Sequence, residues 1–138
     1  MSARLSLFAA ALWWGSLTAV GFMVVPMLFA HLSTPFIAGQ MAAKLFAAQM
    51  WMSAVCCVIL ILLNRPGRPA AILSHSSMSI FIIVLGLLLA LLIQFGVAPR
   101  IVARENLRLW HGAGTAMYGL QWLCAAFVLW RMADRARE

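Results

Sequence analysis

The chain has 138 residues, of which 65% are apolar and only 9% are charged, and its mean hydropathy is +0.99. These values exclude a soluble globular domain, which needs far more polar surface, and they place the chain among integral membrane proteins. The formal net charge is +7, but all except one of the basic residues flank apolar runs. The charge therefore indicates membrane topology and contact with lipid rather than nucleic-acid binding.

Four apolar segments are predicted to be transmembrane helices, at about 5–30, 35–63, 78–97 and 107–132. The first exceeds the apolar core of a signal peptide, roughly 7–15 residues, so it is predicted to remain in the mature protein. The second begins at Thr34 and Pro35, a helix start signal, and ends at the turn-forming sequence NRPGRP. The third is predicted to stop before Pro99. Residues 1–138 thus predict a single all-α domain, an integral membrane bundle of four helices.

The Lys and Arg residues of the loops predict how the bundle is oriented. One end is flanked by six arginines: Arg4, Arg65, Arg68, Arg131, Arg135 and Arg137. The other end is flanked by three: Arg100, Arg104 and Arg108. Because cytoplasmic loops carry the excess of basic residues, both termini are predicted to face the cytoplasm, in a bacterial inner membrane.

Small residues recur at every fourth position in each predicted helix. They are Ala11, Gly15 and Ala19, then Gly39, Ala43 and Ala47, then Gly86 and Ala90, and finally Gly112 and Ala116. Such stripes allow helices to approach closely, either within the bundle or across the faces of a homo-oligomer. The cysteines Cys56, Cys57 and Cys124 lack metal or redox spacing and are predicted to be packed in the interior. The first and third helices end on similar sequences, VVPMLFAH and VAPRIVAR, as expected for two related hairpins.

Polar side chains gather toward the predicted periplasmic side of the bundle. They are His31, Gln40, Lys44, Gln94, Arg100, His111 and Tyr118. Gln40 and Lys44 are one turn apart, and His111, Thr115, Tyr118 and Trp122 form one helical stripe. The leading interpretation is a basic pocket for a small anionic or amphiphilic ligand, beside a first helix loosened near Phe22 by Pro26. The alternative is purely structural: Lys44 reaches the headgroups, and the glutamines join helices.

Two metal sites are further alternatives. His31 and His111 could ligate a haem from different helices, or Met23, Met27 and His31 could offer soft ligands to copper. His75 lies in the predicted cytoplasmic loop and fits neither site.

Enzymatic motifs are missing from the sequence. The carboxylates Glu105, Asp134 and Glu138 lie outside the apolar spans, and there is no phosphate-binding loop, H-E-x-x-H or G-x-S-x-G. A non-enzymatic ligand-binding protein is therefore predicted. A haem-binding redox protein and a structural subunit of a membrane complex are the alternative functions.

The sequence resembles a bacterial family of small four-helix membrane proteins catalogued as a domain of unknown function, which is related to eukaryotic transmembrane proteins associated with platinum-drug resistance. The resemblance covers nearly the whole chain and is carried by LWWGSL, GFMVVPMLFAHLSTPFIAGQMAAKLF, APRI and LWHG. It implies the architecture but no reaction. A more distant likeness is to membrane protoporphyrinogen oxidase and to copper-resistance membrane proteins. In the oxidase, a similar proline precedes a histidine that is thought to bind haem. Here His31 comes one residue early and Met27 replaces an arginine, which argues against transfer of that activity.

Overall fold

The computed structural model of the protein describes residues 2–64 and 73–135, and the regular elements in these ranges are all helical. In chain order they are α1 (Ser2–Thr18), η1 (Ala19–Val24), α2 (Val25–His31), α3 (Pro35–Leu63), α4 (Leu73–Leu92), η3 (Ile93–Val97), α5 (Ala98–Val102) and α6 (Leu107–Arg135). Four continuous runs are long and apolar enough to cross a membrane: Arg4–His31, Pro35–Leu63, Met78–Val102 and Leu107–Asp134. The prediction of an all-α, multi-pass membrane protein is confirmed.

The second and fourth spans begin where the sequence predicts. α3 starts at Pro35, and the hydroxyl of its N-cap Thr34 accepts a hydrogen bond from the Ile37 N–H at 3.3 Å. α4 begins earlier than predicted, so that His75, expected in a loop, lies in its first turn. Arg65, Arg68 and Arg137, which support the predicted orientation, lie outside the described residues.

The third span continues through Pro99, although it was predicted to stop before it. The preceding residue, Ala98, donates its N–H to the Ile93 carbonyl, five residues back, which closes a wide π turn. Val25 donates to the Val20 carbonyl in the same way before Pro26. Proline lacks an N–H and clashes with the carbonyl four residues earlier, and the wider turn relieves both problems. The similarity of the two helix ends therefore extends from their sequences to their backbones.

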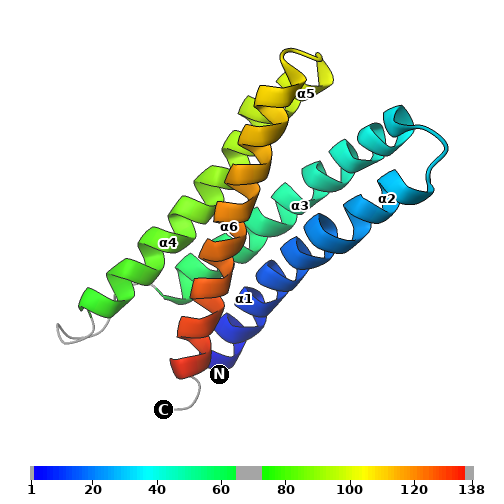
Figure 1. Ribbon diagram of the computed structural model, residues 1–138. Coiled ribbons are helices and arrows are strands. Elements are labelled where there is room, and N and C mark those ends of the chain that lie inside the picture. Colours follow the sequence, from blue (N-terminus) through cyan, green and yellow to red (C-terminus); the bar gives the residue numbers. More distant parts are fainter. Residues whose placement is uncertain (1, 65–72, 136–138) are drawn as a thin grey trace.

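The four spans form two hairpins that are packed together at one end only (Figure 1). α1 packs against α3 and α6, and α4 packs against the same two helices. At the end that holds both termini, all four helices lie together; we call this the closed end. Toward the other end the hairpins diverge, and there α2 packs on α3 while α5 packs on α6. We call this the open end; it carries the connections 32–34 and 103–106.

The closed half holds the core of the bundle. Trp13, Leu17, Leu60, Ile83 and Val128 are fully buried there and come from all four helices. The three cysteines are free and buried, as predicted. Because lipid is as apolar as this core, close packing rather than water exclusion must hold the helices together.

The small-residue stripes divide between the interior and the surface. Gly86 and Ala90 are buried, and a Cβ on Gly86 would lie 2.6 Å from Cη2 of Trp13. In contrast, Ala11 and Ala19 are exposed, and a Cβ on Gly15 would meet nothing within 4 Å. The stripe of α4 therefore faces the interior, where Gly86 leaves room for the Trp13 ring, whereas the stripe of α1 lies on the outer surface.

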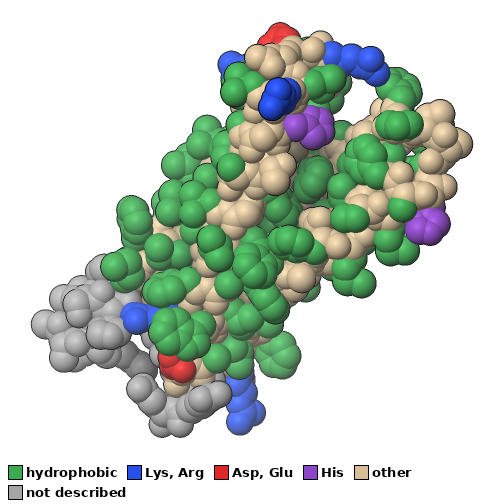
Figure 2. Space-filling view, in the orientation of Figure 1, with side chains coloured by type: hydrophobic (Ala, Val, Ile, Leu, Met, Phe, Trp, Pro, Cys, Tyr) green, Lys and Arg blue, Asp and Glu red, His purple; other side chains and the backbone are tan. Residues whose placement is uncertain are grey.

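Large apolar side chains cover most of the outer surface that Figure 2 shows. Phe8, Trp51, Phe81 and Trp130 are each exposed by 60% or more. Such a surface suits contact with lipid rather than water, in agreement with the predicted bilayer contact.

Candidate functional site

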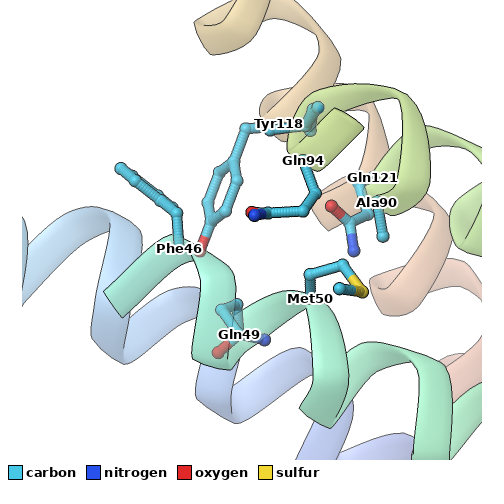
Figure 3. Close-up of a pocket in the computed structure, with 8 residues that line it drawn as sticks. Phe46, Gln49, Met50, Ala90, Gln94, Tyr118 and Gln121 are labelled. Atoms are coloured by element: carbon cyan, nitrogen blue, oxygen red, sulfur yellow. The ribbon is translucent and has the colours of Figure 1, made fainter. Parts of the chain in front are cut away.

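A cleft separates the two hairpins near several of the predicted polar residues. Figure 2 shows the molecule hollowed between the hairpins at the open end. At the base of this cleft, near the middle of the spans, a small cavity lies between α3, α4, η3 and α6 (Figure 3). It is lined by Phe46, Gln49, Met50, Ala90, Ile93, Gln94, Tyr118 and Gln121. Its volume of about 10 Å³ for the centres of water-sized spheres is room for one water molecule.

Gln94 is the unpaired polar group of this cavity. It belongs to the π turn η3, is half-buried, and points its amide toward the centre of the cavity (Figure 3). Within residues 2–64 and 73–135 the Gln94 amide has no hydrogen-bond partner. The amide is therefore free to bond a water molecule or a polar atom of a ligand.

Tyr118 joins the two hairpins at the level of the cavity. Its hydroxyl donates a hydrogen bond of 2.8 Å to the Leu17 carbonyl, and its ring packs edge-on against Phe46 with centroids 5.3 Å apart. A Cβ on Gly21 would lie 2.5 Å from the Tyr118 ring, so the glycine allows this close approach of η1 and α6. Tyr118 is therefore held in place by the fold and has a structural role as well as lining the cavity.

A buried polar network lies directly below the cavity. The Gln49 amide donates to Ser16 Oγ at 3.0 Å and to Ser53 Oγ at 3.4 Å, and the Gln121 amide donates to Ser53 Oγ at 3.1 Å. Ser16 in turn donates to the Trp13 carbonyl. These bonds link α1, α3 and α6 where the hairpins begin to separate. Gln49 and Ser53 were not among the predicted site residues, although they have the same one-turn spacing as Gln40 and Lys44.

The predicted stripe on α6, which consists of His111, Thr115, Tyr118 and Trp122, contacts α1 only through its two lower members. Tyr118 bonds α1 as described, and the Trp122 indole donates to the Thr18 hydroxyl at 2.9 Å. The two upper members, His111 and Thr115, are exposed because the hairpins have separated at their level. The Thr115 hydroxyl bonds only to the carbonyl of His111, at 2.8 Å.

Five of the seven predicted ligand residues lie on exposed surfaces: His31, Gln40, Lys44, Arg100 and His111. Lys44 and the buried Ser53 are about two and a half helical turns apart, so they lie on opposite sides of α3. Lys44 shares its face with Trp51, which is 65% exposed. In the described part of the chain no hydrogen bond or ion pair holds the Lys44 ammonium. The structure thus brings Gln94 and Tyr118 together at the cavity, and none of the other five residues lines it.

The histidines of the predicted haem site lie on different hairpins, His31 at the end of α2 and His111 in α6, whereas the predicted copper ligands Met23, Met27 and His31 follow one another along η1 and α2. The Nδ1 atom of His31 lies 3.0 Å from the Met27 carbonyl, within its own helix. The histidine side chains visible in Figure 2 lie well apart. No group of three or more His, Cys, Asp or Glu side chains among the described residues is arranged to hold a metal ion.

Arginines at the open end contact aromatic rings. The Arg100 guanidinium lies 4.3 Å from the ring centroid of Trp110, on the same hairpin. The Arg104 guanidinium lies 5.6 Å from the ring centroid of Phe36, which belongs to the other hairpin. Neither Arg104 nor Phe36 was a predicted site residue, and only the tertiary arrangement reveals their contact.

Comparison with known proteins identifies the family but no reaction. The sequence model of a family described as "domain of unknown function (DUF4149)" matches residues 8–109. The match covers the first three spans and ends at the start of α6. No curated protein and no solved structure matches the sequence significantly. Since the match extends over more than half of the chain, this membrane protein belongs to the DUF4149 family.

Proposed function

We propose that this protein binds an anionic amphiphile in the cleft between its hairpins, with the charged group at the open end and the apolar part between the helices. The observation that carries the proposal is that the hairpins separate at the end that bears Arg100, Arg104 and Arg108. In a bilayer an apolar cleft is filled by hydrocarbon rather than left empty or filled with water.

The walls of the cleft suit an apolar chain. Phe46 and Met50 line the cavity at its base. Gly39 lies about two turns above Phe46 on the same face of α3, and a Cβ there would meet nothing within 4 Å. The wall is therefore apolar and has free space beside it. At the base, the Gln94 amide would bond either a polar atom of the amphiphile or a water molecule beneath it.

The rim of the cleft favours an anionic headgroup. The three arginines are exposed, and Glu105 is the one carboxylate beside them. Among the residues that the structure describes, no ion pair neutralises any of these arginines. Arginine binds phosphate and carboxylate oxygens through two parallel hydrogen bonds, so an excess of unpaired guanidinium groups selects anionic over zwitterionic or neutral amphiphiles.

Blocking the cleft tests the proposal. Gly39→Phe should lower the affinity for dioleoylphosphatidylglycerol by about tenfold, or ~1.4 kcal/mol, because the ring occupies the space of the chain. Native mass spectrometry of the delipidated protein in detergent measures this binding. The matched control is Gly15→Phe, since a Cβ on Gly15 would also meet nothing within 4 Å but the residue lies in the small-residue stripe on the outer surface of α1.

The two variants together decide whether lipid occupies the cleft. The control should bind as the unchanged protein does, and both variants should keep their unfolding temperature because neither site is crowded. Equal binding by the unchanged protein and Gly39→Phe would show that lipid does not occupy the cleft. Equal binding of phosphatidylglycerol and phosphatidylcholine by the unchanged protein would contradict the charge selectivity.

The open end is proposed to face the periplasm of a bacterial inner membrane, with both termini in the cytoplasm. The support is the excess of arginines in the segments of the closed end. Alkaline phosphatase fused to the C-terminus should therefore be inactive, whereas the same enzyme inserted after Ser33 should be active. Activity of the C-terminal fusion would reverse the orientation and place the cleft in the cytoplasmic leaflet.

A further inference from the structure

The connection between α5 and α6 holds Arg104 in a defined position. Arg104 and Asn106 have positive φ angles of 58° and 33°, a region that residues other than glycine seldom adopt. Three successive N–H groups, those of Ala103, Arg104 and Glu105, bond to carbonyls of α5 at 2.9 to 3.0 Å. Asn106 then caps α6, and its carbonyl accepts from the Leu109 and Trp110 N–H groups. The backbone at Arg104 is therefore fixed at the tip of a tight turn.

The side chain of Arg104 crosses the mouth of the cleft. Its guanidinium lies 5.6 Å from the ring centroid of Phe36, and Phe36 stands in the first turn of α3 on the opposite hairpin. Figure 2 shows a basic side chain extending between the hairpins at this end. Arg100, in contrast, stays on its own hairpin over Trp110, and Arg108 has no such contact in the described structure.

The contact between Arg104 and Phe36 is weak enough for an anionic group to replace the ring as the partner of the guanidinium. The Phe36 side chain is 57% exposed, and an exposed cation–π contact at this distance is weak. A charged hydrogen bond from the guanidinium to a phosphate or carboxylate oxygen is stronger, above all when it is bidentate. An anionic group that arrives at the mouth would therefore take the guanidinium from the ring.

We propose that Arg104 is the headgroup-selecting residue of the cleft: it bridges the mouth to Phe36 in the free protein and binds the anionic group of a membrane lipid in the complex. This inference rests on the proposed function and deepens it. Phe36, once released, adds its ring to the apolar wall beside the lipid chain. The occupant is a lipid of the surrounding leaflet, because the mouth opens among apolar helix faces rather than into a polar channel.

The test compares Arg104 with arginines of both ends. Arg104→Gln should reduce the preference for dioleoylphosphatidylglycerol over dioleoylphosphatidylcholine by about tenfold, and Arg108→Gln, at the same rim, should reduce it by less. Arg4→Gln, at an exposed arginine of the closed end, should leave it unchanged. Arg104→Lys should fall between, because lysine keeps the charge but loses the bidentate geometry. Phe36→Leu should retain or increase the preference, because the ring competes with the anion. A merely structural Arg104 would alter unfolding temperature but not this ratio of affinities.

The possible outcomes distinguish the role of Arg104 from the binding of an anionic amphiphile in the cleft. If the unchanged protein shows no preference for the anionic lipid, the proposed function itself fails. If it shows the preference but Arg104→Gln and Arg108→Gln reduce it equally, only the role of Arg104 is wrong. Inorganic phosphate added at millimolar concentration should not displace the lipid, and displacement would show that the site takes a soluble anion instead.

Discussion

Gly86→Ala is expected to destabilise the protein by about 2 kcal/mol, although replacing a helical glycine by alanine normally stabilises. The new methyl group would lie 2.6 and 2.7 Å from two ring carbons of Trp13. The Trp13 side chain is fully buried and rigid, so it cannot move aside cheaply. Either the backbone of α4 must shift or the indole must move. Reversible unfolding in mixed micelles measures the loss.

Gly119→Ala is the matched control for this experiment. Gly119 also lies within a long helix, but a Cβ there would meet nothing within 4 Å. Alanine should therefore be neutral or stabilise by up to ~1 kcal/mol. Combining Gly86→Ala with Trp13→Leu should remove most of the penalty of the alanine, because the clash partner is gone. Equal stability of Gly86→Ala and the unchanged protein would mean that the Trp13 ring does not lie against Gly86 as described.

Ser53→Ala should lower the free energy of unfolding by about 1–2 kcal/mol, since one hydroxyl serves two buried amides. Without it, the Gln121 amide loses its acceptor, and the Gln49 amide keeps only Ser16. The protein should still fold, because the core of the closed half is untouched. Urea or detergent unfolding followed by tryptophan fluorescence reports the change.

A double-mutant cycle checks the origin of this loss. In a Gln121→Leu background the amide that Ser53→Ala would leave unpaired is absent, so the serine substitution should cost markedly less. Ser33→Ala, in the exposed connection 32–34, should change stability by less than about 0.5 kcal/mol. Additive costs for Ser53 and Gln121 would show that their hydrogen bond contributes nothing to stability.

The four spans were predictable because the signals that define them are local. Length and apolar composition mark a membrane helix, and Thr34 with Pro35 marks a start, without reference to any neighbour. The continuation through Pro99 was not predictable, because it depends on whether the backbone widens before the proline or breaks there. Sequence allows both responses.

The inward faces of the helices were much harder to predict. A soluble helix reveals its buried face because the other face is polar, whereas a membrane helix is apolar on both faces. Gln40 with Lys44 and Gln49 with Ser53 have the same spacing on α3, yet the first pair is exposed and the second is buried. Gln94 and Tyr118 were both predicted on the same side of the bundle, and both line the cavity. The position of a residue along a helix gives its depth in the membrane. The side of the helix on which its side chain lies becomes known only when the neighbouring helices are placed.

The divergence of the hairpins has a consequence for the lipids around the protein. A bundle that is narrow at one end and broad at the other has a larger cross-sectional area in one leaflet than in the other, much like a wedge. Lateral pressure in the broad leaflet acts to close the hairpins, whereas a molecule seated between them acts to hold them apart. The π turns before Pro26 and Pro99 lie at the level where the wedge begins. The packing stress of one monolayer therefore acts directly on the width of the cleft.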